Sequence, residues 1–203
     1  SPLAREGFKM FEEAPEQWIR EVYISDGIRD RVSAIPGMRE KLVRTGCETV
    51  SPEVFRKMSD TQSPQGILCI LKRPRYSLEE LLSVPAPLFL VLENLQDPGN
   101  LGTIVRTGEG AGVTGIIMGA GTTDIYNPKT IRATMGSVFR VPFVYMENLS
   151  QAVGRLRENG VRVYAAHLEG ERYYDSFSFR EGTAFLIGKR GSAVSWLPRR
   201  ILT

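Results

Sequence analysis

Short apolar segments alternate with amphipathic ones in the second part of the chain, from Pro87 onward. The apolar segments have the length and composition of buried strands. These predicted strands are residues 88–95, 114–119, 141–146, 161–168 and 183–188. Apolar positions recur at helical spacing between them, and the predicted helices are residues 101–110, 131–139 and 150–160. Such alternation predicts an α/β fold with a parallel sheet that helices cover on both faces.

The first part of the chain, up to residue 72, contains shorter elements of both kinds. Helices are predicted at residues 8–13, 39–45 and 52–60, and strands at residues 21–25, 48–50 and 66–71. This pattern predicts a small α/β domain. The next segment, KRPRYSLEELLSVPAP, is rich in proline and is predicted to be a linker. We therefore expect two domains, residues 1–82 and residues 83–203.

A parallel sheet of this kind indicates where a ligand binds. Ligands lie beyond the carboxyl ends of the strands, because the loops that follow the strands meet there. The loops of interest therefore follow Leu92, Met118, Ala166 and Ile187.

Composition excludes several classes of site. The chain has 203 residues, and its apolar fraction of 42% is enough for a core. The net charge of +3 permits a polyanionic partner but does not require one. Cys47 and Cys69 are too few for a disulfide framework, and a single histidine, His167, forms no zinc cluster. We therefore expect no metal site, and any His-dependent catalysis would have to use His167.

The sequence carries no signal for a membrane. It has no apolar run of about 18 residues. Its amino terminus, SPLAREGFKMFEE, is charged where a secretory signal is apolar. We therefore expect a cytoplasmic protein.

The loop after the first strand of the second domain lacks a nucleotide-binding fingerprint. A dinucleotide site needs G-x-G-x-x-G directly after the strand, whereas this chain has ENLQDPGNLG, with glycines at positions 99 and 102 only. No G-x-x-x-x-G-K-[ST] motif occurs either. A nucleotide-dependent oxidoreductase and a P-loop enzyme are therefore disfavoured.

The same loop ends in polar residues at a predicted helix start. The sequence DPGN at residues 97–100 predicts a tight turn, and Asn100 is expected either to cap the helix or to serve in a site. Arg106 lies roughly 120° from Asn100 around the helix. A lone helical arginine is typical of a solvated charge or a surface salt bridge, but its apolar neighbours favour a position beside the sheet.

Two further clusters lie at predicted helix and strand ends. The segment NPKTIRATMGSVF contains Lys129, Arg132 and Thr134, which suit phosphate contacts or an ordinary solvated helix face. The segments YAAHLEG and FLIGKRG contain small residues, which suit a flat, adenosine-sized ligand or simply tight packing. At this point both interpretations of each cluster stay open.

Taken together, these segments resemble the SpoU (TrmH-like) branch of the SPOUT RNA methyltransferases. The first motif of that family, N-x-x-D-P-x-N-x-G-x-I-x-R, is complete here, at Asn94, Asp97, Pro98, Asn100, Gly102, Ile104 and Arg106. The stretch NPKTIRATMGSVFRVPF resembles the second-helix segment of the family, and FLIG resembles the opening of its second motif. Residues 8–72 resemble the L30e-like substrate-binding domain of the ribosomal RNA members.

The resemblance implies transfer of a methyl group from S-adenosylmethionine to a ribose 2'-hydroxyl of RNA, with ribosomal (23S) RNA as the expected substrate. It also implies a homodimer whose carboxyl-terminal region forms a trefoil knot. It assigns the catalytic role to Arg106, with Asn94 and Asn100 positioning the loop and the ribose. Because a guanidinium group keeps its proton, Arg106 is expected to orient the hydroxyl and the adjacent phosphate.

The resemblance also implies binding residues. Lys129, Arg132 and Thr134 are expected to contact RNA. The pocket for the methionine and adenosine moieties is expected to be lined by Ala165, Ala166, His167, Ile187, Gly188 and Lys189. For His167, a pocket-lining role is favoured over that of a proton carrier.

The chain departs from the family pattern after FLIG. There the family has Asn-Glu-Gly-x-Gly and later a third motif, whereas this chain has KRGSAVSWLPRRILT, with Lys189 and Arg190 in place of an amide and a carboxylate. A frameshift or an early stop after Gly188 would produce such an ending, and sequencing of the source gene tests this hypothesis. We expect an incomplete knot and weak or absent cofactor binding. The alternative function is that of a non-catalytic RNA-binding protein or an inactive truncated relative.

Overall fold

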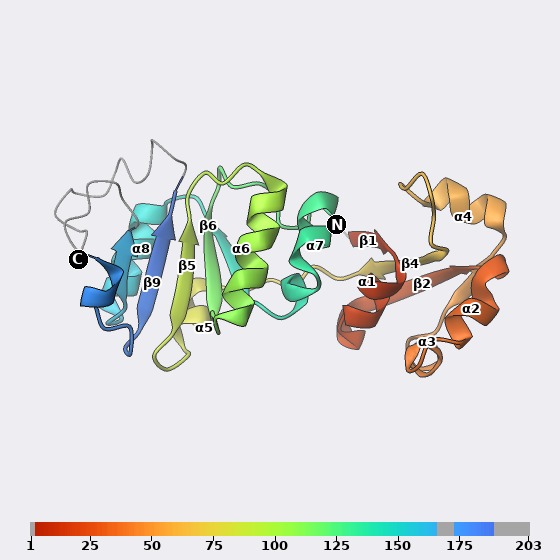
Figure 1. The fold of residues 1–203 in the computed structure, drawn as a ribbon, viewed down its shortest axis with the longest axis horizontal. Coiled ribbons are helices and arrows are strands. Elements are labelled where there is room, and N and C mark those ends of the chain that lie inside the picture. The colour runs from red at the N-terminus through yellow and green to blue at the C-terminus, as the bar shows by residue number, and fades with distance from the viewer. Residues whose placement is uncertain (1–2, 166–172, 189–203) are drawn as a thin grey trace. The chain divides into compact units, whose positions relative to one another are not determined.

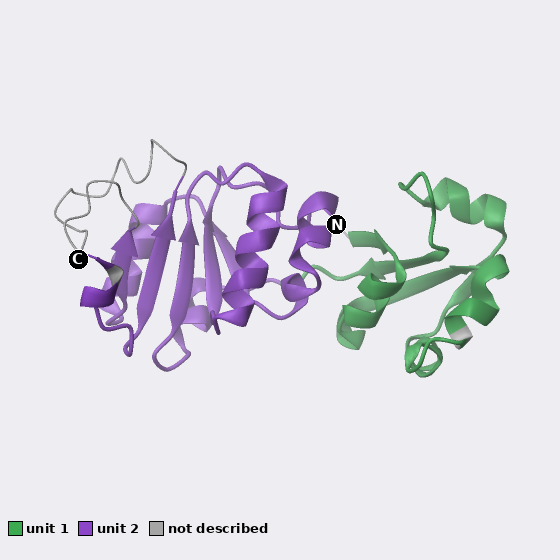
Figure 2. Cartoon of the chain, in the orientation of Figure 1, with its two compact units in different colours: residues 1–74 green, residues 75–203 purple. Residues whose placement is uncertain are grey.

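The structure is a computed structural model, and it describes residues 3–165 and 173–188 (Figure 1). The chain divides into two compact units, residues 1–74 and residues 75–203 (Figure 2). Each unit has its own sheet, and apolar side chains are buried in both.

The first unit is built on a four-stranded sheet in the order β1-β4-β2-β3. Strand β4 pairs antiparallel with β1 and β2, and β3 pairs parallel with β2. The strands are β1 (Leu3–Glu6), β2 (Ile19–Ser25), β3 (Glu48–Val50) and β4 (Ile67–Leu71). The helices are α1 (Phe8–Glu13), α2 (Arg29–Ser33), α3 (Met38–Thr45) and α4 (Pro52–Met58), with 3-10 turns at Glu16–Trp18 and Asp26–Ile28.

Local sequence accounts for the start of α4, and buried aromatic residues hold α1 and α4 in the core. Helix α4 begins where the Ser51 hydroxyl accepts a hydrogen bond from the Val54 amide at 3.3 Å, with Pro52 at the first helical position. Phe11 of α1 and Phe55 of α4 are buried and hold their helices in the core. The predicted helices and strands of this unit are all present, whereas the short β1 and α2 were not predicted.

The division between the units comes before the predicted boundary at residues 82 and 83. Part of the predicted linker forms α5 (Leu78–Leu82), which begins with a capping box: Ser77 Oγ accepts from the Glu80 amide at 3.2 Å, and the Glu80 carboxylate accepts from the Ser77 amide at 2.6 Å. Leu78 and Leu81 are buried in the core of the second unit. Apolar burial therefore assigns this helix to the second unit.

The second unit contains a five-stranded sheet in the order β7-β6-β5-β9-β8. Every pairing in it is parallel. The strands are β5 (Leu88–Leu92), β6 (Gly115–Gly119), β7 (Phe143–Met146), β8 (Arg162–Ala165) and β9 (Thr183–Ile187). A further 3-10 turn lies at Tyr174–Ser176. In Figure 1 the arrowheads of β5, β6 and β9 point to the same edge of the sheet.

Helices cover both faces of this sheet (Figure 1). Helix α5 and helix α8 (Leu149–Glu158) pack on one face, where Leu156 lies in a core with Phe89 and Ile117. Helix α6 (Pro98–Gly110) covers the other face with its buried residue Val105. Its Gly108 lies so near the sheet that an added β-carbon would be 3.0 Å from Leu90 Cδ1. The predicted α/β fold with a two-sided parallel sheet is confirmed.

Helices α6 and α7 differ most in extent from the prediction. Helix α6 begins at Pro98, three positions before the predicted start. Helix α7 (Pro128–Thr134) ends early, because Met135 and Gly136 adopt left-handed conformations with φ of 51° and 92°. A 3-10 turn, Ser137–Phe139, follows, where the prediction had continuous helix.

The predictions about a membrane segment and about a trefoil knot can be compared only with the residues that the structure describes. No helix in those ranges combines the length and the hydropathy that crossing a membrane requires. The predicted trefoil knot concerns the carboxyl-terminal region, and residues 189–203 lie outside the described ranges.

Candidate active site

The carboxyl ends of the parallel strands place the loop after β5 beside the end of β9. The Glu93 amide donates to the Ile187 carbonyl at 2.9 Å. Ala165 pairs with Leu186, so the end of β8 lies at the same edge. Ala165, Ile187 and Gly188 are each half-buried. This edge therefore combines the start of the first motif with strand ends that leave some backbone accessible.

The structure brings together only part of the predicted cofactor-binding set. The three residues that it describes, at the ends of β8 and β9, share one sheet edge as predicted from the parallel topology. The other three predicted residues, Ala166, His167 and Lys189, lie outside the described ranges. Their roles remain predictions.

Helix α6 begins directly after the first-motif loop. The Asp97 carboxylate caps it by accepting from the Asn100 amide at 2.7 Å, and Pro98 occupies the first helical position. The prediction that Asn100 caps the helix is therefore wrong, because Asp97 is the cap. Asn100 lies within the first turn and its side chain is exposed. It is free for another role.

Arg106 lies on the exposed face of α6. Its neighbour Val105 is fully buried against the sheet, whereas Arg106 and Thr103 are exposed. Within the described ranges Arg106 makes no ion pair or hydrogen bond through its side chain. The expectation that apolar neighbours place Arg106 beside the sheet is wrong, since the helix turns it outward. By helical rise it lies roughly 9 Å along the axis from Asn100.

The loop after β6, residues 120–127, packs against the first-motif loop. Thr122 Oγ1 donates to the Leu92 carbonyl at 3.3 Å, and the Thr123 amide donates to the Leu95 carbonyl at 2.9 Å. These hydrogen bonds, to the end of β5 before Asn94 and to the first-motif loop after it, restrict how that loop can move. Asn94 itself has a left-handed backbone, with φ of 52°.

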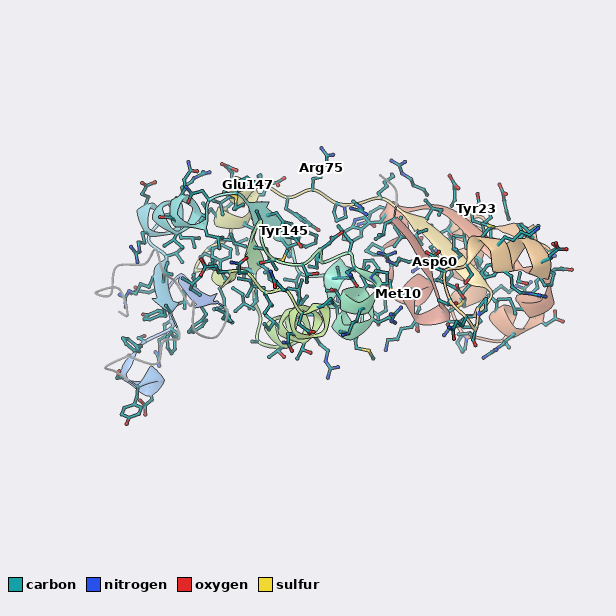
Figure 3. All side chains as sticks on the ribbon, turned by 90° about the horizontal axis from the view of Figure 1, so that it is seen from above. Met10, Tyr23, Asp60, Arg75, Tyr145 and Glu147 are labelled. Atoms are coloured by element: carbon teal, nitrogen blue, oxygen red, sulfur yellow. The ribbon has the colours of Figure 1, made fainter. Side chains whose placement is uncertain are left out.

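Tyr145 of β7, which is labelled in Figure 3, forms hydrogen bonds with the loop after β6. Its hydroxyl accepts from the Ile125 amide at 2.8 Å and donates to the Thr123 carbonyl at 2.8 Å. Burial raises the pKa of Tyr145 to about 12, so the hydroxyl keeps the proton that it donates. Tyr145 is not among the predicted site residues, because in the sequence only its place at the end of a predicted strand marks it.

Helices α6 and α7 pack closely through Gly102. A β-carbon added at Gly102 would overlap the β-carbon of Ala133 and lie 2.7 Å from the Thr130 carbonyl oxygen. Asn127 caps α7 by accepting from the Lys129 amide at 2.9 Å. The glycine of the first motif therefore sets the spacing between the two helices.

The predicted RNA-contacting residues of α7 do not all face outward. Lys129 and Arg132 are exposed, and Lys129 Nζ lies 4.0 Å from the Asp97 carboxylate. Such an exposed pair is weak. Thr134 is fully buried and donates to the Ile131 carbonyl at 2.7 Å. The prediction that Thr134 contacts RNA is therefore wrong, because its hydroxyl is buried and donates to a carbonyl of its own helix.

Metal-ligating side chains do not gather in the part of the chain that the structure describes. No group of three or more His, Cys, Asp or Glu side chains there is arranged to hold a metal ion. Cys69 is buried, and burial raises the pKa of its thiol to about 12. It therefore behaves as a core residue.

Comparison with protein families matches both units. The profile of the SpoU rRNA Methylase family matches residues 87–197, more than half of the chain. The profile of the RNA 2'-O ribose methyltransferase substrate-binding family matches residues 6–77. The second range ends close to the division between the two compact units.

Individual relatives agree with these matches. The chain is 32% identical, over 93% of its length, to the 23S rRNA (guanosine(2553)-2'-O)-methyltransferase RlmP of Bacillus subtilis, and it covers 72% of that protein. It is 36% identical, over 63% of its length, to the human mitochondrial rRNA methyltransferase 3, of which it covers 31%.

A solved structure of an AdoMet-bound rRNA methyltransferase from Sinorhizobium meliloti superposes with a TM-score of 0.75 at 28% identity. The superposition covers 94% of this chain and 72% of the other. Family profile, relative and fold agree, so the chain belongs to the SpoU rRNA methylase family.

Proposed function

We propose that this protein transfers a methyl group from S-adenosylmethionine to a ribose 2'-hydroxyl of RNA, with 23S ribosomal RNA as the substrate. One observation carries the proposal. At the carboxyl edge of the sheet the Glu93 amide donates a hydrogen bond to the end of β9, and the first motif continues from there into α6. Membership of the SpoU rRNA methylase family supports the reaction class. The names of the Bacillus and Sinorhizobium relatives support the substrate and the cofactor.

The described residues at the edge fit S-adenosylmethionine. Gly188 has no side chain and Ala165 has a small one, so a flat adenosine group can approach the backbone there. When bound, S-adenosylmethionine supplies an electrophilic methyl group. Ala165, Ile187 and Gly188 would hold it, together with the predicted residues outside the described ranges.

Arg106 acts on the RNA by orientation and charge. A guanidinium group has donors and no acceptor, so Arg106 does not remove the proton of the hydroxyl, which passes to solvent as the methyl group is transferred. It donates hydrogen bonds to the phosphate beside the reacting ribose, and holds the hydroxyl in line for attack. Asn94 and Asn100 have carboxamides that donate and accept, which suits a ribose with hydroxyl groups.

The rest of the exposed surface extends the RNA contact. Lys129 and Arg132 bind phosphate as exposed cations of α7. The first unit binds the substrate RNA, which the match to the substrate-binding family supports. The protein acts as a homodimer, as the resemblance to the SpoU branch implies, and it is cytoplasmic.

The test is methyl transfer from tritiated S-adenosylmethionine to 23S ribosomal RNA, followed by digestion to nucleosides. Label in a 2'-O-methylnucleoside is the expected result, and label in a base contradicts the proposal. Salt-sensitive RNA binding without transfer identifies the non-catalytic alternative. Calorimetry with S-adenosylmethionine tests the separate prediction of weak cofactor binding, which a micromolar dissociation constant contradicts.

A further inference from the structure

Gly121, in the loop after β6, lies directly against the side chain of Asn94. A β-carbon added to Gly121 would overlap Asn94 Oδ1 and lie 3.0 Å from its Cγ. Carbon atoms at optimal contact are about 3.5–4.0 Å apart, so an alanine does not fit beside the present carboxamide. Gly121 does not have a positive φ, so its backbone does not require glycine. The side chain of Asn94 is what requires it.

The first-motif loop cannot easily retreat from an added methyl group. The Glu93 amide is bonded to Ile187 just before Asn94, and the Leu95 carbonyl accepts from the Thr123 amide just after it. Both anchors are backbone hydrogen bonds to neighbouring elements. A methyl group at position 121 would therefore displace the exposed carboxamide of Asn94 rather than the loop.

Other closely packed glycines of the second unit differ in this respect. At Gly102 the conflicting atoms include the Thr130 carbonyl, and at Gly115 they belong to the buried side chains of Leu81 and Phe89. Substitution there disturbs the fold. At Gly121 all three nearest atoms belong to the exposed side chain of Asn94, so an added methyl group would displace that side chain and leave the fold intact.

We propose that Gly121 is a positioning residue, whose bare backbone leaves the space in which the Asn94 carboxamide lies against the loop after β6, at the carboxyl edge of β5. This inference rests on the proposed function of Asn94 in RNA methylation. A carboxamide donates through one end and accepts through the other, so its direction decides which ribose group it can bind. Misplacement of a positioning group by about 1 Å can cost about 10²-fold in rate.

The test compares Gly121→Ala, Asn94→Ala and the double variant with the wild-type protein in methyl transfer to 23S ribosomal RNA. The matched control is Gly154→Ala, at a glycine of α8 with no atom near its added β-carbon. We expect Gly121→Ala to lower kcat about 10²-fold, with KM for RNA changed less than about threefold. The double variant should be no slower than Asn94→Ala, because Gly121 acts through Asn94. Gly154→Ala should match the wild type.

A second readout does not depend on activity. The side-chain amide resonances of Asn94 in a ¹⁵N-labelled protein should shift in Gly121→Ala, while the melting temperature changes by less than about 2 °C. Unmoved resonances overturn the inference, and so does a double variant slower than Asn94→Ala. A wild-type protein without transfer contradicts the proposed function instead, and the resonances then decide the inference about Gly121 alone.

Discussion

The two faces of α6 differ in what their side chains contact. One face is buried: Leu101 and Val105 lie against the sheet, and Gly102 approaches the backbone of α7. The other face presents Asn100 and Arg106 to solvent, and within the described ranges neither side chain has a hydrogen-bonding partner.

The contrast separates the residues of one motif into two kinds. Gly102 is needed to pack the helix, whereas Asn100 and Arg106 contribute little to packing and remain available to a ligand. A motif that is complete at every position can therefore serve both the fold and the chemistry. Substitutions on the two faces should have opposite consequences, for stability on one and for activity on the other.

The largest effect on stability is expected for Gly102→Ala. The added methyl group would overlap Ala133 and crowd the Thr130 carbonyl, so we expect the free energy of unfolding to fall by about 3 kcal/mol. The matched control is Gly110→Ala, at a helical glycine of α6 with open space around it. Urea denaturation measures both, and the control should gain up to about 1 kcal/mol. Equal stability of the two variants would contradict the account of the buried face.

A smaller loss of stability is expected for Asp97→Ala, which removes the N-terminal cap of α6. The Asn100 amide would lose its acceptor, so we expect a loss of about 1 kcal/mol in thermal or urea denaturation. Asp97→Asn keeps a capping oxygen and should retain most of the stability. If both substitutions lower the free energy of unfolding equally, the charge of Asp97 stabilises the helix and its capping hydrogen bond does not.

Tyr145→Phe should cost about 1 kcal/mol, because the Ile125 amide loses its acceptor. The folded protein holds the pKa of Tyr145 at about 12, above its ordinary value of 10.0. The unfolded chain therefore releases this proton first, and stability should fall as the pH rises from about 10 to 12. That part of the fall should be absent in Tyr145→Phe. Tyr173→Phe, at an exposed tyrosine, is the control and should behave as the wild type.

The smallest effect on stability is expected for Lys129→Ala. The lysine is exposed and its distance to Asp97 is 4.0 Å, so the free energy of unfolding should change by less than about 0.5 kcal/mol. RNA binding is the informative readout. The slope of log affinity against log salt should decrease by about one. An unchanged slope would remove Lys129 from the RNA surface.

The sequence predicted the sheet and its helices well, because each strand and helix must bury an apolar face. The prolines around α5 predict a linker, whereas in the structure Leu78 and Leu81 are buried in the core of the second unit. The early end of α7 depends on the left-handed conformation of Met135. The sequence does not predict this conformation, because it is unfavourable for residues other than glycine.

The site was less predictable than the fold. The position of Pro98 signals Asp97 as the cap, and that signal was available in the sequence. The burial of Thr134 was harder to predict, because a threonine hydroxyl can donate its hydrogen bond to a carbonyl of the same helix and so needs no outside partner. The contact between Gly121 and Asn94 joins two loops that are distant in sequence, so only the folded structure reveals it.

The most direct test of the central claim compares Arg106→Ala with Arg157→Ala, an exposed arginine on α8. We expect Arg106→Ala to lower methyl transfer to 23S ribosomal RNA by about 10²–10³-fold, with the free energy of unfolding close to wild type and RNA affinity reduced only by the loss of one phosphate contact, while Arg157→Ala changes none of the three. Transfer by Arg106→Ala at the wild-type rate would contradict the claim that the exposed face of α6 carries the chemistry.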